Sequence, residues 1–199
     1  MPATHASEAI VLLGAAMRRV LQALGAPRAI LAGWPEGVEA VPCAPSLLPV
    51  LRFLPHTMVA TVPETDALAA QLIAEVAGLA WAQSFASGEA SPAFLANYGW
   101  TEIIGPRAPL RAARLSAGFL LLGPRMAFPL HRHPAEELYV PLSGTAVWRR
   151  GRRPFGPVPP GQIIHHSPWL PHAMRTSDEP LLAMYVWRGD DFTEAPMLG

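Results

Sequence analysis

Residues 123–144 read GPRMAFPLHRHPAEELYVPLSG. In an extended strand, residues i and i+2 project to the same face, so His131 and His133 should point in the same direction. The proline that follows interrupts strand pairing because it has no backbone N–H to donate, and the next strand repeats the alternation with Glu137 and Tyr139. The segment therefore predicts two short strands that direct four polar side chains toward one interior.

A third imidazole belongs to His172, in the later sequence PHAM. One histidine on an apolar strand is more often a buried core residue than a ligand. A His-x-His pair, a glutamate four residues later and a distant histidine after a proline are together improbable as packing alone. Three imidazoles and one carboxylate, without thiolates, suit Fe(II), Mn(II), Ni(II) or Zn(II). The predicted metal ligands are His131, His133, Glu137 and His172.

These segments resemble one protein family. HRHPAEELYVPLSGTAVW at residues 131–148, a Pro-Gly pair before a following strand, and PHAMRTSDEPLLAMYVWRGD at residues 171–190 are similar to the cupin-type dimethylsulfoniopropionate lyases. The similarity covers residues 95–192 well and the mainly helical N-terminal half only in general character. It implies a mainly β fold, a cupin barrel of the jelly-roll or double-stranded β-helix type, with a helical N-terminal extension packed on it.

The resemblance also implies roles for individual residues. The family's metal ligands correspond to His131, His133, Glu137 and His172. We expect one ion per chain, with Fe(II) or Mn(II) favoured over Zn(II) or Ni(II). The tyrosine two residues after the glutamate, Tyr139, corresponds to the catalytic base.

Two features depart from the family pattern. The stretch from Gly123 to His131 is two residues longer than the usual cupin spacing, which we expect to affect only a loop. Phe128 stands at about the position where the family carries an additional active-site tyrosine. Tyr98 and Tyr185 are the candidates to replace that phenol.

After Trp100 the sequence changes to β patterning. Short apolar runs alternate with Gly, Pro and Ser at roughly ten-residue spacing, which is typical of a sandwich or small barrel. The expected strands are 117–122, 138–142, 146–149, 162–165 and 181–187. We therefore divide the chain into a helical region, residues 1–100, and a cupin barrel with the metal site, residues 101–199, packed as one folding unit.

The first hundred residues predict three helices. Ser7 as N-cap, apolar residues at helical spacing and Gly25 as a stop predict the first helix. The second runs from residues 65–66 to about Phe85, and a short third begins at residues 91–92.

Composition excludes several classes of protein. All 15 basic residues are arginine, which excludes Schiff-base lysine chemistry. A single cysteine, Cys43, excludes an intramolecular disulfide. The net charge is zero, and the arginine cluster at residues 149–153 is interpreted as a solvated hairpin tip, so no nucleic-acid partner is expected.

No targeting or membrane segment is predicted. The first apolar run, residues 9–16, follows Glu8 instead of a basic stretch and is too short to span a bilayer. We expect a cytoplasmic protein with no membrane partner, and we leave a homodimer open.

The predicted function is metal-dependent β-elimination from a small carboxylate that bears a good leaving group. The resemblance implies dimethylsulfoniopropionate as the substrate, and dimethyl sulfide and acrylate as the products. Three alternatives share the fold and ligands. A cupin dioxygenase would consume oxygen, an isomerase or epimerase would release no volatile product, and a non-catalytic small-molecule-binding cupin would lose nothing when Tyr139 is changed.

Several aromatic residues are candidates for substrate binding. An aromatic ring can hold a sulfonium by a cation–π contact, although packing in the barrel core is the simpler interpretation for at least half of them. The candidates are Phe128, Trp148, Trp169, Tyr185 and Trp187.

His165 and His166 are adjacent on one expected strand and therefore point in opposite directions. At most one of them faces inward, and we interpret both as supporting or structural residues.

Overall fold

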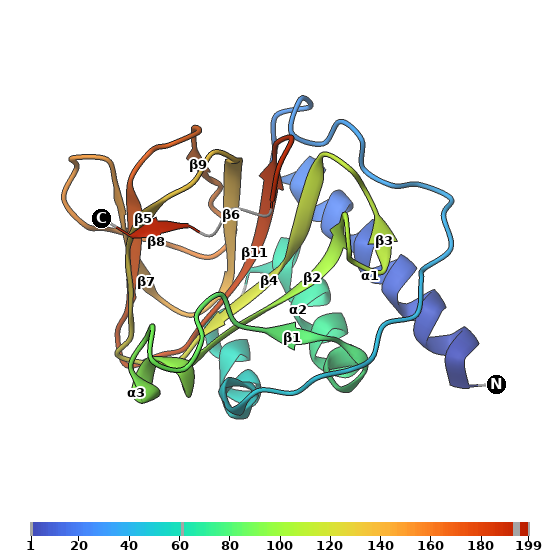
Figure 1. The fold of residues 1–199 in the computed structure, drawn as a ribbon, viewed down its shortest axis with the longest axis horizontal. Helices are drawn as coiled ribbons and strands as arrows, with labels where there is room; N and C mark the ends of the chain where they lie inside the picture. Colours follow the sequence, from blue (N-terminus) through green and yellow to red (C-terminus); the bar gives the residue numbers. More distant parts are fainter. Residues whose placement is uncertain (1, 61, 193–195, 199) are drawn as a thin grey trace.

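The computed structural model describes residues 2–60, 62–192 and 196–198. Two sheets, antiparallel apart from the short β2–β3 pair, form the barrel, and helices cover the outer face of one of them (Figure 1). The expected fold class, a cupin barrel with an α-helical N-terminal region packed on it, is confirmed.

The larger sheet has the strand order β1-β2-β4-β11-β6-β9, with β3 paired to β2. Its strands are β1 (Trp81–Ala82), β2 (Tyr98–Gly105), β3 (Leu110–Arg111), β4 (Leu115–Leu122), β6 (Glu136–Ser143), β9 (Ile164–His166) and β11 (Leu181–Arg188). The smaller sheet has the order β12-β5-β10-β7-β8. Its strands are β5 (Ala127–Arg132), β7 (Ala146–Arg150), β8 (Gly156–Val158), β10 (His172–Thr176) and β12 (Met197–Leu198).

The strands of the larger sheet alternate between two apolar cores. In β4, Phe119 and Leu121 pack on the helical side, whereas Leu120 and Leu122 belong to the cluster inside the barrel. Because both faces are buried, this strand is a nearly continuous apolar run and not an alternating one. The sheet thus separates a structural core from the barrel interior.

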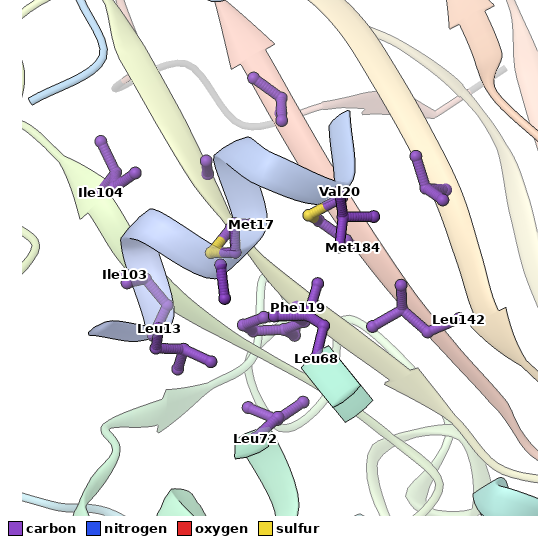
Figure 2. Packing of buried hydrophobic residues seen from close by; sticks show 14 of the residues in the cluster. Leu13, Met17, Val20, Leu68, Leu72, Ile103, Ile104, Phe119, Leu142 and Met184 are labelled. Carbon is purple, nitrogen blue, oxygen red and sulfur yellow. The ribbon is translucent and has the colours of Figure 1, made fainter. Parts of the chain in front are cut away.

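Two helices form the outer layer. Figure 2 shows Met17 of α1 (Pro2–Ala23) and Leu68 of α2 (Pro63–Glu75) lying near Phe119 of the sheet. All three side chains are almost completely buried. Burial of each such side chain stabilises the fold by about 1.5–3 kcal/mol.

The predicted bounds of the first two helices were wrong. Helix α1 begins at Pro2, a favourable first helical residue, and Ser7 is no cap because its hydroxyl donates to the carbonyl of Ala40 at 3.3 Å. Helix α2 ends at Glu75, and a 3-10 turn, η2 (Val76–Gly78), leads the chain into β1. The apolar spacing that predicted a longer helix continues past Glu75 because residues in β1 are also buried.

The other elements agree with the sequence more closely. Helix α3 (Pro92–Leu95) is capped by Ser91, whose hydroxyl accepts a hydrogen bond from the Phe94 amide. The five predicted strands are confirmed, each to within two residues. The 3-10 helix η1 (Pro49–Ala60) was not predicted, and β2 begins at Tyr98, before the proposed division at residue 100. That division into two regions stays a prediction.

No helix in the described part of the chain combines the length and apolar character needed to cross a bilayer.

Candidate metal centre

The four predicted ligands converge between the two sheets. His131 of β5 and His172 of β10 are paired directly in the smaller sheet, and their ring centroids are 4.1 Å apart. Glu137 lies on β6 of the larger sheet, and His133 lies in the connection between β5 and β6. All four side chains are buried. The candidate ligand nitrogens of the three histidines lie within 4.8 Å of one another.

Backbone carbonyls orient each of these histidines. The Nδ1 atoms face the carbonyl oxygens of Pro129 for His131 (2.8 Å), Ala135 for His133 (3.1 Å) and Leu170 for His172 (2.8 Å). A carbonyl oxygen can only accept, so each Nδ1 carries the hydrogen and each neutral ring keeps its lone pair on Nε2. Hydrogen bonds of this kind commonly fix the orientation of metal-binding histidines.

Glu137 faces two of these Nε2 atoms. Its Oε2 lies 3.1 Å from Nε2 of His172 and 3.4 Å from Nε2 of His133. Within the described residues, neither nitrogen has a hydrogen-bond partner. Lone pairs that face a carboxylate repel it unless a positive charge lies among them. A divalent ion would supply that charge and accept all of these donors, so the residues fit a metal.

A further residue, His166, belongs to the same cluster. Its Nδ1 lies 2.8 Å from Oε2 of Glu137, and its ring stacks on that of His172 at 4.0 Å. Its Nε2 is buried and has no hydrogen-bond partner in the described part of the chain. Candidate ligand atoms of Glu137, His166 and His172 form a second group within 4.8 Å, which shares His172 with the first.

The inward direction of His166 follows from strand pairing. Strand β9 pairs with β6 so that His166 is opposite Glu137, while His165 points outward, with Nε2 2.9 Å from Glu136. Alternation indicates that one of the two histidines faces inward, but it does not say which one. The register between strands that are distant in sequence decides this, and alternation alone does not encode it.

The charges in the cluster favour a cation at its centre. Burial, with the charge of His172 as a smaller cause, lowers the pKa of His131 to about 3, so His131 is neutral at neutral pH. Burial by itself would lower the pKa of His172, but Glu137 raises it above its usual value. Burial by itself would raise the pKa of Glu137, yet the surrounding imidazoles of His172, His133 and His166 hold it well below its usual range. Glu137 is therefore an ionised carboxylate in a buried site.

Tyr139 lies beside this cluster, two residues after Glu137 on the same face of β6. Its ring packs 5.0 Å from that of Trp148. Burial raises the pKa of Tyr139 well above its usual value, and the charge of Glu137 raises it further. The phenol can therefore lose its proton at neutral pH only with a cation close by.

A cavity of about 230 Å³ opens beside the cluster. His131 and Tyr139 line it, as do three of the residues predicted to bind substrate, Phe128, Tyr185 and Trp187. A space of this size suits a small molecule better than a nucleotide or a peptide.

The other two predicted substrate-binding residues lie elsewhere. Trp148 is buried behind the ring of Tyr139 and is not part of the cavity lining. Trp169 is 45% exposed and lies outside the cavity, because the loop before β10 turns there with a positive φ of 62°. Its position gives no support to a substrate-binding role.

A sequence model of the dimethylsulfoniopropionate lyases matches residues 36–183. The chain belongs to this family. It is 30% identical over 180 residues to dimethylsulfoniopropionate lyase DddQ from Ruegeria pomeroyi, with 89% of each chain covered.

Solved structures of dimethylsulfoniopropionate lyases have the same fold over nearly the whole chain. A chain from the crystal structures of the DMSP lyases RdDddP and RnDddQII superposes with a TM-score of 0.88 at 29% identity and covers 98% of this chain and 99% of that one. The crystal structure of DddQ from Ruegeria pomeroyi gives a TM-score of 0.84 at 27% identity, with 96% of each chain covered.

Phe128, at the position where the resemblance predicts a tyrosine, lines the cavity. The Phe128 ring is 4.8 Å from that of His131 and 5.1 Å from that of Tyr98. Tyr98 and Tyr185, the two candidates to replace the missing phenol, both line the same cavity. The hydroxyl of Tyr98 shares a 2.9 Å hydrogen bond with Ser84.

Trp187 contacts two of the predicted ligands and also lines the cavity. Its ring stacks on His133 at 4.2 Å, and its Nε1 donates a hydrogen bond to Oε1 of Glu137. Its place opposite Glu137 in the β11–β6 pair accounts for both contacts.

We expect His166→Phe to weaken metal binding by about 10- to 100-fold, the usual effect of removing a group that orients a ligand. Phenylalanine keeps a flat ring against His172 but removes the contact with Glu137 and the free nitrogen. Competition with a chromophoric chelator measures the affinity. His165→Phe, at the exposed neighbouring histidine, should leave the metal affinity unchanged. Equal affinities in the two variants would show that His166 does not contribute to metal binding.

Proposed function

We propose that this member of the family cleaves dimethylsulfoniopropionate by metal-dependent β-elimination and releases dimethyl sulfide and acrylate. One observation carries most of the weight: a buried phenol, Tyr139, lines the cavity two residues from Glu137 in the ligand cluster. A candidate base, a candidate metal site and a small cavity are thus adjacent, which supports a lyase of this kind.

His131, His133, Glu137 and His172 would hold the metal. Their nitrogen and oxygen donors support Fe(II) or Mn(II), with Zn(II) and Ni(II) as alternatives. When bound, the ion supplies positive charge that stabilises the phenolate of Tyr139 and the negative charge that develops on the substrate.

Tyr139 moves the proton in this reaction. Its Oη, as phenolate, takes a proton from the carbon next to the substrate carboxylate. The electron pair of that C–H bond forms the double bond of acrylate while the bond between the β-carbon and sulfur breaks. Sulfur leaves with the bonding pair as neutral dimethyl sulfide, and the proton on Oη returns to water.

The aromatic lining suits the charged substrate. Tyr185 and Trp187 line the cavity. A cation over the face of an aromatic ring gains about 0.5–2 kcal/mol when water is excluded. Phe128 and Leu120 contribute apolar surface that keeps water away from the reacting carbons.

Product analysis tests this proposal. Metal-loaded protein incubated with dimethylsulfoniopropionate should release dimethyl sulfide into the headspace and an equal amount of acrylate into solution, without oxygen uptake. Oxygen consumption would favour a cupin dioxygenase, and an isomeric carboxylate without a volatile product would favour an isomerase.

Phe128→Tyr should raise kcat/KM for this substrate. The new hydroxyl would enter the cavity near His131, and a hydrogen bond gained in the transition state is worth about 1–3 kcal/mol, or roughly fivefold to a hundredfold in rate. Initial rates of sulfide release measure the gain. An unchanged rate in a folded, metal-loaded variant would show that the phenol lost at this position is not needed here.

A further inference from the structure

One row of residues crosses the larger sheet from the ligand cluster to the far side of the cavity. Tyr139 of β6 is paired with Tyr185 of β11. Tyr185 is paired with Gly118 of β4, and Gly118 with Glu102 of β2. Three strand spacings of about 4.8 Å separate the first and last of these strands. Tyr139, Tyr185 and Glu102 line the cavity, and Gly118 places no side chain between them.

The backbone of β2 directs Glu102 into the cavity. The register of β2 against β4 shifts between Glu102 and Ile104, which marks a β-bulge. Ile103 and Ile104 both pack on the helical side, whereas Glu102 faces the barrel. A Cβ at Gly118 would lie 1.9 Å from the carbonyl oxygen of Thr101, so only glycine fits beside the bulge. Bulges commonly redirect a side chain next to a functional site.

The Glu102 carboxylate has a hydrogen-bond donor but no close cation. Ser116 Oγ donates to Oε1 at 2.5 Å. Over the described ranges of the chain, no arginine or histidine nitrogen lies within 4.0 Å of this carboxylate. Burial raises the pKa of Glu102 despite Ser116 and the more distant Arg107 and Arg111. A partly buried carboxylate without a counter-ion costs free energy that a bound cation offsets.

The two ends of the cavity differ in charge. His131 and Tyr139 mark the end next to the metal ligands. Among the described lining residues Glu102 is the one carboxylate, and none is an arginine. The substrate carboxylate therefore belongs at the metal end. Its positive group then faces Glu102 and the ring of Trp100, which lines the cavity as well.

We propose that the Glu102 carboxylate contacts the positively charged group of the substrate and selects onium carboxylates over neutral carboxylates of the same shape. This inference rests on the proposed function for the class of substrate and adds the residue that recognises its charge. Glu102 is a specificity residue, because proton transfer belongs to Tyr139.

A pair of ligands that contain no sulfur tests the proposal. 3-(Trimethylammonio)propanoate and 4,4-dimethylpentanoate have the same shape and differ in carrying a cationic nitrogen or a neutral carbon. By titration calorimetry, metal-loaded wild-type protein should bind the cation at least about tenfold more tightly, the scale of a charge-assisted contact. Glu102→Gln keeps the size of the side chain and an acceptor for Ser116, and should reduce this preference to less than about threefold.

Matched variants control for charge and structure. Glu8→Gln removes an exposed carboxylate from α1 and should keep the full preference. Glu102→Asp retains the charge and should keep more of the preference than Glu102→Gln. Metal content and melting temperature should agree among all four proteins.

Two results would overturn the proposal: an unchanged preference in folded, metal-loaded Glu102→Gln, or equal binding of both ligands by the wild type. The second needs no variant, so it decides even if Glu102→Gln does not fold.

The outcome is separable from that of the proposed function because this test measures binding, and neither ligand can release dimethyl sulfide. Loss of the preference in Glu102→Gln, with no dimethyl sulfide released by the wild type, would support the role of Glu102 in cation binding and contradict the proposed lyase activity. Release of dimethyl sulfide by the wild type, with the preference intact in Glu102→Gln, would support the lyase activity and contradict the role of Glu102.

Discussion

Tyr139→Phe should reduce the release of dimethyl sulfide by at least about 100-fold, the usual scale for the loss of a general base. Phenylalanine keeps the ring that packs against Trp148 but removes the hydroxyl that accepts the proton. Bound metal and melting temperature should stay close to those of the wild type, since the predicted ligands are unchanged. Headspace gas analysis at saturating substrate measures the rate.

The other tyrosines of the chain provide the comparison. Tyr98 and Tyr185 line the same cavity and are also buried. Tyr98→Phe and Tyr185→Phe should each retain more activity than Tyr139→Phe. A wild-type rate in Tyr139→Phe, or an equally deep loss in one of the other two variants, would move the role of base away from Tyr139.

His133→Ala and His172→Ala should each lower bound metal to near background while the chain stays folded. The two residues come from different segments, the β5–β6 connection and β10, and each directs a buried Nε2 at Glu137. Removal of either breaks the set of donors and leaves the carboxylate charge uncompensated. Elemental analysis of purified protein measures the metal, and circular dichroism checks the fold.

His56→Ala is the matched control, because this histidine is exposed and lies outside both candidate ligand groups. It should bind metal like the wild type. Stoichiometric metal in both His133→Ala and His172→Ala would show that the ion is held somewhere else.

The barrel could be predicted from sequence because its signals are local. Runs such as Leu181–Arg188 are short, apolar and bounded by turn residues, and the five predicted strands are present. The end of α2 could not be predicted in the same way. Leu79 and Trp81 continue the apolar pattern of the helix, but the tertiary structure buries them in the turn and strand that follow Gly78.

The candidate site was predictable where its residues are close in sequence. Alternation along the segment indicates that His131, His133, Glu137 and Tyr139 share an interior, although His133 itself lies in the connection between β5 and β6. His166 and Glu102 reach the site through strand pairing over long sequence separations. The direction of the Glu102 side chain also depends on a β-bulge, and nothing in the surrounding sequence indicates the shifted register.

The most direct test is the rate of dimethyl sulfide release as a function of the amount of bound metal. It shows whether the buried histidine cluster supports elimination. Protein stripped by a chelator should release no sulfide above the rate without enzyme. Addition of Fe(II) or Mn(II) should then raise the rate in proportion to the metal bound, up to one ion per chain. A full rate from metal-free protein, or no sulfide from fully loaded protein, would contradict a metal-dependent lyase built on His131, His133, Glu137 and His172.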